Sequence, residues 1–194
     1  ELAGNISSST FDVVAASNIA ALDLDVTTVP SSDVEVGETI KLADFELSET
    51  NDNEDVVVKS ITLKLAGSMD HQDDLSDIVI TVDGKEVATG LTINDDEEIV
   101  ADLDYTIAAD ENADFVVTAL VVGGINETVS ATLTEVFAVG AETGISATVA
   151  GVPYVTATSR TIEGAEINVS FDKSDIDEAR VNAEEVSVWS LTLS

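Results

Sequence analysis

Clusters of carboxylate side chains are the most frequent candidates for chemistry in this chain of 194 residues, which carries 39 acidic and 7 basic side chains. Carboxylate and carbonyl oxygens are the ligands that Ca²⁺ prefers, and a loop can gather several of them around one ion. The acidic loops supply candidate calcium ligands, which are Asp52, Asp55, Asp70, Asp73, Asp172, Asp175 and Asp177. The alternative is that these loops are hydrated and keep the surface soluble, and we expect no cofactor to be required.

The segment that begins at Asn51 imitates the start of an EF-hand loop but departs from it at two positions. Val56 stands where the turn requires glycine, and Thr62 stands where the loop ends in a bidentate glutamate. The segment is therefore not an EF-hand. At a formal net charge of −32, the surface must nonetheless be screened by salt or by bound cations.

Side chains suited to acid–base or nucleophilic catalysis are scarce. His71 is the only histidine, and the chain has no cysteine. The sequence has no Gly-x-Ser-x-Gly elbow, no phosphate-binding glycine loop and no His-Glu-x-x-His motif. We therefore expect His71 to be a solvated loop residue and the protein not to be an enzyme.

The charge and composition of the chain exclude several classes of function. A strongly negative field repels nucleic acid and anionic lipid, so neither is expected as a partner. Apolar runs such as Ala119–Val122 are far shorter than the ~20 residues that span a bilayer, and no membrane insertion is expected. The hydrophobic content of 44% excludes a disordered acidic tail. After these exclusions, the sequence is that of a folded, anionic protein.

Apolar and polar residues alternate with period two along most of the chain, which is typical of half-buried strands. The clearest run is Ile99–Ile107, in which five apolar side chains share one face. Asp83-Gly84 lies between two such runs and is a hairpin signal, because both turn positions need a positive φ. We predict an all-β fold, a jelly-roll or Ig-like antiparallel β-sandwich.

One segment near the carboxyl end departs from this alternation. Ser174–Asp177 matches a capping box, and apolar residues follow at helical spacing. The pattern predicts one short helix at residues 175–184, which leads to a last strand at Val186–Leu193. A shorter helical turn is predicted at Asp73–Asp77.

Residues 1–29 form an N-terminal extension that differs from the rest of the chain, because they contain few charges after Glu1 and are followed by Pro30, which cannot donate to a sheet ladder. Two interpretations stay open. These residues are the first two strands of the domain, or they are an arm on a β-sandwich domain at 30–194 that completes the sheet of a neighbouring copy. The side chains expected to fill the neighbour's groove are Phe11, Val13, Ala15, Ile19, Leu22, Leu24 and Val26.

The first residue of the chain and its Asn-x-Ser/Thr tripeptides, which can accept N-glycans, are relevant to the cellular location of the protein. The first residue is Glu1 and the only methionine is Met69, so we expect that a secretory signal peptide was cleaved, although a shortened fragment would begin in the same way. Patterns for N-glycosylation occur at Asn5, Asn126 and Asn168. Such tripeptides are common by chance and add little; the charge, the missing initiator methionine and the lack of catalytic residues favour an extracellular or cell-surface location.

Two stretches, Val36–Leu47 and Glu54–Leu63, combine a Gly-x-x-Ile…Phe-x-Leu strand, a polar gap and an Ile-x-Leu strand. This pattern resembles secreted β-sandwich surface proteins, among them biofilm-fibre subunits of the TasA and camelysin type, archaeal bundling-pilus subunits and surface proteins of small uncultivated bacteria. Tyr105–Asp110 followed by Phe115–Ala119 is similar to a segment of such chains. In the fibre-forming members an N-terminal strand inserts into the next subunit, and the resemblance implies this role for residues 1–29.

The leading hypothesis is therefore a structural protein. We expect a subunit of an extracellular filament or pilus, whose partners are copies of itself joined head to tail by donor-strand complementation. The alternative is a surface-layer or adhesin-type module that binds calcium or a glycan.

Overall fold

In the part of the chain that the computed structural model describes, the residues with the period-two pattern form a sandwich of two β-sheets, with one short helix, α1 (His71–Asp74). The structure describes residues 19–52, 54–164, 169–172 and 190–193. The first sheet has the spatial order β10 (Thr148–Ala150), β1 (Ala21–Val26), β3 (Thr39–Glu49), β8 (Asn112–Val121), β5 (Leu75–Val82) and β6 (Lys85–Leu91). The second has the order β2 (Val34–Glu35), β11 (Tyr154–Glu163), β9 (Thr128–Gly140), β4 (Val56–Gly67) and β7 (Glu98–Ile107). The predicted all-β sandwich is confirmed.

The core lies between the two sheets and is built from the apolar faces predicted for the strands. Ile61, Leu63 and Leu65 of β4 are all fully buried, as are Ile99 and Ala101 of β7. Burial of such side chains is the main favourable term in folding. The alternation therefore decides which face of each strand points inward.

The predicted hairpin at Asp83-Gly84 connects β5 to β6. The two residues have φ angles of 51° and 74°. A two-residue type I′ turn needs such a positive φ at both of its central residues. The Tyr105 hydroxyl donates to Asp83 Oδ2 at 2.7 Å. This hydrogen bond connects β7 of the second sheet to the hairpin of the first.

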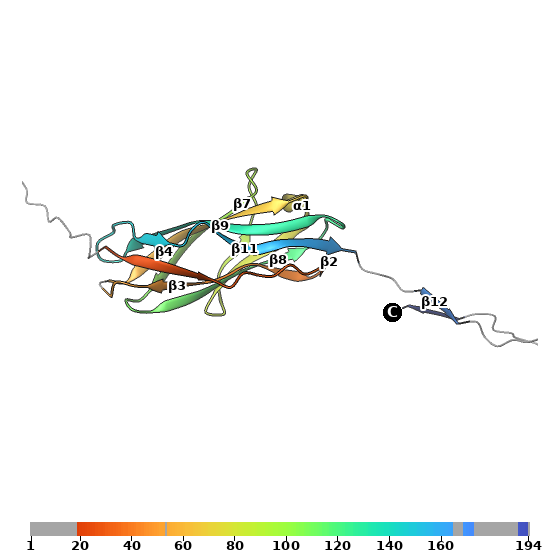
Figure 1. Ribbon diagram of the computed structural model, residues 1–194, viewed down its shortest axis with the longest axis horizontal. Coiled ribbons are helices and arrows are strands. Elements are labelled where there is room, and N and C mark those ends of the chain that lie inside the picture. Colours follow the sequence, from red (N-terminus) through yellow and green to blue (C-terminus); the bar gives the residue numbers. More distant parts are fainter. Residues whose placement is uncertain (1–18, 53, 165–168, 173–189, 194) are drawn as a thin grey trace, which may run out of the picture. The chain divides into compact units, whose positions relative to one another are not determined.

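Two strand pairs depart from the predicted antiparallel pattern. β1 is parallel to β10, and β2 is parallel to β11. β1 and β2 are consecutive parts of one extended segment, which runs first along the first sheet and then along the edge of the second (Figure 1). A single stretch of chain therefore contributes to both sheets.

The carboxyl-terminal unit is described by itself. β12 (Val169–Asp172) pairs antiparallel with β13 (Ser190–Leu193) in a separate two-stranded sheet. The compact unit that contains the sandwich ends at Glu163, inside the domain predicted at residues 30–194.

The helices predicted from the sequence have different outcomes. The predicted helix at residues 175–184 and the start of the strand predicted at Val186–Leu193 lie outside the described residues. The turn predicted at Asp73–Asp77 is helical from His71 to Asp74 instead. Within the part of the chain that the structure describes, no helix has the length and apolar character to cross a bilayer.

Candidate functional site

The amino-terminal strand β1 fills a gap in the first sheet between two strands that are remote from each other in the sequence. On one side it pairs antiparallel with β3, from Leu22↔Glu49 to Val26↔Phe45. On the other side it pairs parallel with β10, from Ala21↔Thr148 to Asp23↔Ala150. We call the gap between β3 and β10 the β1 slot. The edges of β3 and β10 both offer backbone N–H and C=O groups for pairing. The slot can therefore accept an extended strand that has suitable side chains.

Three of the residues predicted for a donated strand lie in the β1 slot of their own chain. Leu22 is 1% exposed and belongs to the core, and Leu24 and Val26 are partly buried against it. Ile19 precedes β1, and its carbonyl accepts a hydrogen bond from Asn51 Nδ2 at 2.7 Å. The other predicted residues, Phe11, Val13 and Ala15, lie outside the described residues.

The connection that follows β1 passes into the second sheet. The Thr27 amide donates to the Asp44 carbonyl at 2.9 Å. Val29 pairs with β11, donating to the Thr156 carbonyl at 2.8 Å and accepting from the Thr158 amide at 3.0 Å. Residues 21–29 therefore pair with strands of both sheets, and Pro30 follows the point where the chain has crossed from the first sheet to the second.

A buried carboxylate, Glu49, holds the wall of the β1 slot where β3 ends. Glu49 Oε1 accepts the Asn51 amide at 2.9 Å, and Oε2 accepts the Asp52 and Asp110 amides at 2.8 and 3.2 Å. Burial raises the pKa of Glu49, but hydrogen bonds from these amides and from that of Ala21 outweigh it, so the pKa lies below the ordinary value of 4.5. Next to Glu49, the Thr50 amide donates to the Ala21 carbonyl at 3.1 Å, so this end of β3 is connected to the start of β1.

A second buried carboxylate, Glu54, holds the other wall. It accepts the Thr143 hydroxyl at 2.7 Å and the Glu142 and Thr143 amides at 2.9 and 3.0 Å, all from the turn between β9 and β10. The Thr143 hydroxyl is the main cause of a lowered pKa of Glu54; burial opposes it, and the two amides add to it. A Cβ at Gly140 would overlap with this carboxylate, so Glu54 requires glycine there.

Replacing Glu54 by Gln is expected to lower the free energy of unfolding by about 1–3 kcal/mol at pH 7, because donors of the turn lose a charged acceptor. The folded pKa is below 4.5, so the stabilisation is complete above that pH and is lost as the pH falls through the folded pKa. Urea unfolding at pH 7 and pH 3 should show the difference between the wild type and the variant shrinking in acid. The exposed neighbour Glu142→Gln is the control and should unfold like the wild type at both pH values; a constant difference would contradict this role.

The predicted cation ligands are not assembled into a site in the described part of the chain, where no group of three or more histidine or acidic side chains is arranged to hold a metal ion. Asp55 Oδ1 instead accepts the Ala109 amide at 3.0 Å, and Asp52 lies in a turn with φ of 49°. Asp70 precedes α1 and Asp73 belongs to it, and both are exposed. Asp175 and Asp177, which were grouped with Asp172, lie outside the described residues. Calcium binding therefore stays a prediction.

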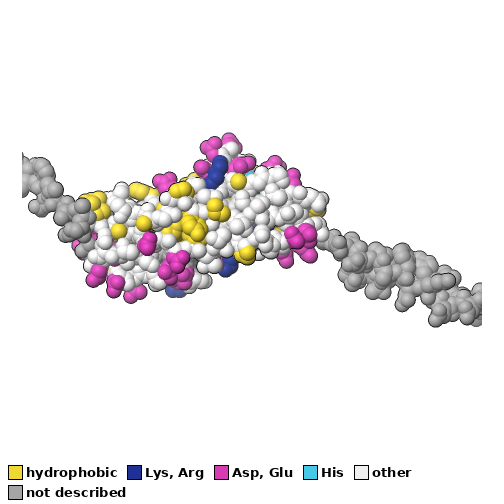
Figure 2. Space-filling view, viewed as in Figure 1, with side chains coloured by type: hydrophobic (Ala, Val, Ile, Leu, Met, Phe, Trp, Pro, Cys, Tyr) yellow, Lys and Arg dark blue, Asp and Glu magenta, His cyan; other side chains and the backbone are white. Residues whose placement is uncertain are grey.

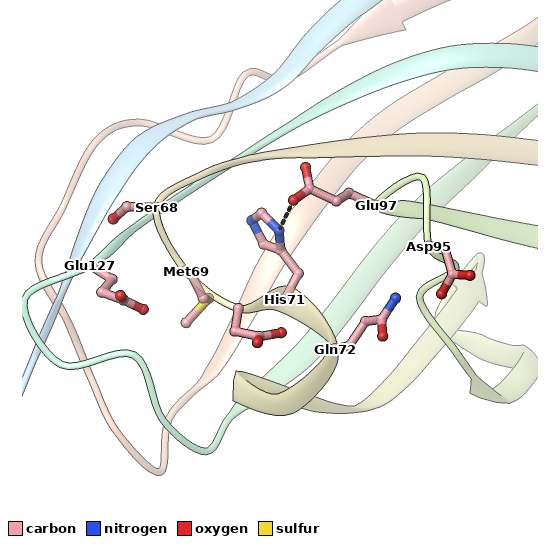
Figure 3. A pocket seen from close by; sticks show the side chains of 8 residues that line it. Ser68, Met69, His71, Gln72, Asp95, Glu97 and Glu127 are labelled. Atoms are coloured by element: carbon pink, nitrogen blue, oxygen red, sulfur yellow. Dashed lines mark ion pairs between the residues drawn. The ribbon is translucent and has the colours of Figure 1, made fainter.

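The expectation that His71 is a solvated loop residue is wrong, because His71 is the first residue of α1 and is only 2% exposed. His71 Nδ1 lies 3.7 Å from Glu97 Oε1, and neither ring nitrogen has a hydrogen-bond partner among the described residues (Figure 3). The ring lines a cavity of about 380 Å³ together with acidic side chains, among them Asp95 and Glu127. The sequence signal that was missed is the spacing of two between Met69 and His71, both of which are buried.

One of the three predicted N-glycosylation sites, Asn126, lies in the described residues. Asn126 is exposed in the turn between β8 and β9, with φ of 66°. A turn on the surface is where an acceptor asparagine is accessible to modification. Asn5 and Asn168 lie outside the described residues.

Acidic side chains project mainly around the ends and edges of the face shown in Figure 2, and hydrophobic side chains gather over its middle. The large hydrophobic residues exposed on strands of the second sheet are Val100, Phe137, Tyr154 and Val155. The negative charge therefore surrounds a surface that is partly apolar.

Comparison with known proteins identifies no family. No family model matches the chain, and no curated protein matches its sequence. Among solved structures, a cohesin module from a family 33 glycoside hydrolase of Clostridium perfringens is similar at 14% identity, with 76% of this chain and 99% of that chain covered and a TM-score of 0.39.

Two further solved structures have similar coverage. A non-cellulosomal cohesin from the archaeon Archaeoglobus fulgidus has 12% identity, covers 76% of this chain and 91% of its own, and gives a TM-score of 0.35. A PapD-like domain of human CEP192 has 11% identity, covers 84% of this chain and 99% of its own, and gives a TM-score of 0.36. The chain is thus distantly similar to β-sandwich domains of the cohesin and PapD-like types.

Proposed function

We propose that this chain is a structural subunit of an extracellular filament or pilus, whose copies are joined when β1 of one copy fills the β1 slot of the next. The observation that carries the proposal is the position of β1, which is held between β3 and β10 by backbone pairing on both sides. Its link to the rest of the domain is the short connection through Pro30 to β2. Exchange of such an element between copies is a low-cost route to assembly.

The contacts of the β1 slot do not depend on which copy supplies the strand. The ladders to β3 and β10 use backbone groups, and Leu22 contributes about 1.5–3 kcal/mol by full burial. When each copy donates one strand and accepts another, the contact is heterologous and generates an open filament if its rotation does not close.

The surface and the sequence support the same proposal. Val36–Leu47 and Glu54–Leu63 resemble fibre subunits of the TasA and camelysin type. In those subunits the exchanged strand precedes the matching segments, as β1 does in this chain. A net charge of −32 keeps free subunits apart until a specific contact forms. In this proposal the protein is secreted, is not an enzyme, and has copies of itself as partners.

Disulfide trapping tests the exchange directly, because the chain has no cysteine of its own. Asp23 of β1 and Ser48 of β3 are register partners on the solvent face, at a spacing that a disulfide can bridge. The Asp23→Cys and Ser48→Cys single variants are refolded together at high concentration and oxidised. We expect a covalent dimer that contains one chain of each variant, and filaments by electron microscopy.

The controls separate exchange from accidental oxidation. The Asp23→Cys/Ser48→Cys double variant should crosslink within one chain at low concentration. Asp23→Cys mixed with Thr106→Cys, an exposed position on β7 of the other sheet, should give no mixed dimer above background. If the double variant forms its internal crosslink and the mixed single variants never form a mixed dimer, β1 stays in its own chain and the proposal is wrong.

A further inference from the structure

Arg160 of β11 is a cation in the interior of an acidic protein. Its side chain is 4% exposed, and its Nη2 donates to the Lys41 carbonyl of β3 at 2.7 Å. Only one other arginine, Arg180, occurs in the chain. The guanidinium therefore joins the two sheets from within.

The register of the strands explains why Arg160 reaches this position. β3 has an irregularity between Lys41 and Ala43, and β11 has one between Ala157 and Arg160. The carbonyls of Leu42 and Lys41 are reached from the opposite sheet, by the Thr156 hydroxyl at 2.8 Å and by Arg160. Arg160 thus satisfies a backbone group that the bulge exposes.

This structural role leaves the charge of Arg160 without compensation. No carboxylate lies within ion-pair distance of the guanidinium among the described residues, and its buried Nε has no hydrogen-bond partner there. Burial lowers the pKa of the guanidinium, but arginine stays charged in proteins. A buried charge with no counter-charge is unfavourable, so the site favours an anion.

A cavity lies at Arg160. Its volume is about 190 Å³, enough for several water molecules, and hydroxyl groups predominate among its other lining side chains, which are Ser31, Ser32, Asp33, Ser159 and Thr161. Hydroxyl and guanidinium donors together suit the oxygens of a carboxylate, sulfate or phosphate group. Asp33 is the one lining residue that opposes an anion.

We propose that the cavity at Arg160 is a binding site for a small oxyanion of the carboxylate, sulfate or phosphate class. The oxyanion accepts hydrogen bonds from Arg160 and from the surrounding serine and threonine hydroxyls. Ser31–Asp33 belong to the crossing between β1 and β2, so a bound anion also ties this crossing to β11. The site follows from the buried charge and the cavity, and it does not rest on the proposed strand exchange.

Nuclear magnetic resonance of the full chain labelled with ¹⁵N-arginine gives a direct test. The two arginines give two Nε–H signals, and Arg180→Lys assigns them. Acetate, sulfate and phosphate are titrated against chloride at constant ionic strength. We expect a saturable shift of the Arg160 signal with each oxyanion and none with chloride, while the Arg180 signal stays in place. Equal shifts of both signals, or a linear response without saturation, would overturn the site.

Two variants give an independent measurement by thermal unfolding. Arg160→Met keeps the volume of the side chain, and replacing a buried charge by an apolar group is often tolerated. It should abolish the oxyanion-specific rise in Tm, beyond the general effect of sulfate and phosphate on stability. Asp33→Asn removes the opposing charge and should strengthen binding, and an unchanged or weaker response would contradict the site even if Arg160→Met fails to fold.

The source of the oxyanion is decided by the same signal. A dissolved anion shifts the Arg160 resonance in a way that does not depend on protein concentration. An acidic side chain from a second copy shifts it without added anion, and only as the protein concentration rises. Either result supports an oxyanion site, and no shift under either condition refutes it.

Discussion

A chain that lacks residues Glu1–Val26 is expected to lose about 3–6 kcal/mol of unfolding free energy, and a synthetic peptide of residues Ile19–Pro30 is expected to restore most of it. The loss follows from full burial of Leu22 and partial burial of Leu24 and Val26, together with two backbone ladders. A globular domain is stable by about 5–15 kcal/mol, so the truncated chain should be marginal. Thermal unfolding with and without the peptide measures both effects.

Two controls make this result specific to the β1 slot. A chain that lacks only Glu1–Asn18 keeps β1 and isolates the contribution of the strand. The same peptide with Leu22→Asp should not bind, because it places a charge in the core. If the normal and altered peptides stabilise the truncated chain equally, or if the truncated chain unfolds like the wild type, the slot is not a specific receptor for β1.

Phe115→Ala is expected to lower the free energy of unfolding by about 3–5 kcal/mol, which corresponds to a fall in Tm of about 6–20 °C for a protein of this size. Phe115 is fully buried on β8 and contacts aromatic rings from both sheets. Its ring centroid lies 5.3 Å from that of Phe45 in a stacked arrangement and 5.8 Å from that of Tyr105 in an edge-to-face arrangement. Truncation removes these contacts and leaves a cavity between the sheets.

The adjacent residue supplies the matched control for this substitution. Val116 lies on the same strand, points to the opposite face and is only half-buried. Val116→Ala should cost less than half as much as Phe115→Ala. Similar losses from the two variants in urea or thermal unfolding would show that the ring contacts of Phe115 do not contribute the expected stability.

The strands and their inward faces were predictable because they depend on local information. Side chains alternate across a strand, so apolar residues at every second position define a buried face. Ile61, Leu63 and Leu65 are buried as this rule requires. The hairpin at Asp83-Gly84 was predictable for a similar reason, because glycine and aspartate adopt the left-handed conformation that the turn needs.

The roles of the polar residues were not predictable, because they depend on partners that are distant in the sequence. Glu54 accepts hydrogen bonds from Glu142 and Thr143, across 88 and 89 positions, although its surroundings predict a hydrated acidic loop. Arg160 reaches the carbonyl of Lys41 across 119 positions. Nothing in the local pattern distinguishes these side chains from exposed ones.

The sequence by itself determined an all-β chain, the inward face of its main strands, its tight turn and its large negative charge. Only the tertiary structure decided that the segment after residue 18 enters its own first sheet between β3 and β10 and then crosses to β11. The physical reason is that alternation specifies a buried face but not the strand that will pair with it. Pairing is chosen by backbone ladders and bulges between remote segments, and these same ladders form the β1 slot and bring Arg160 to its cavity.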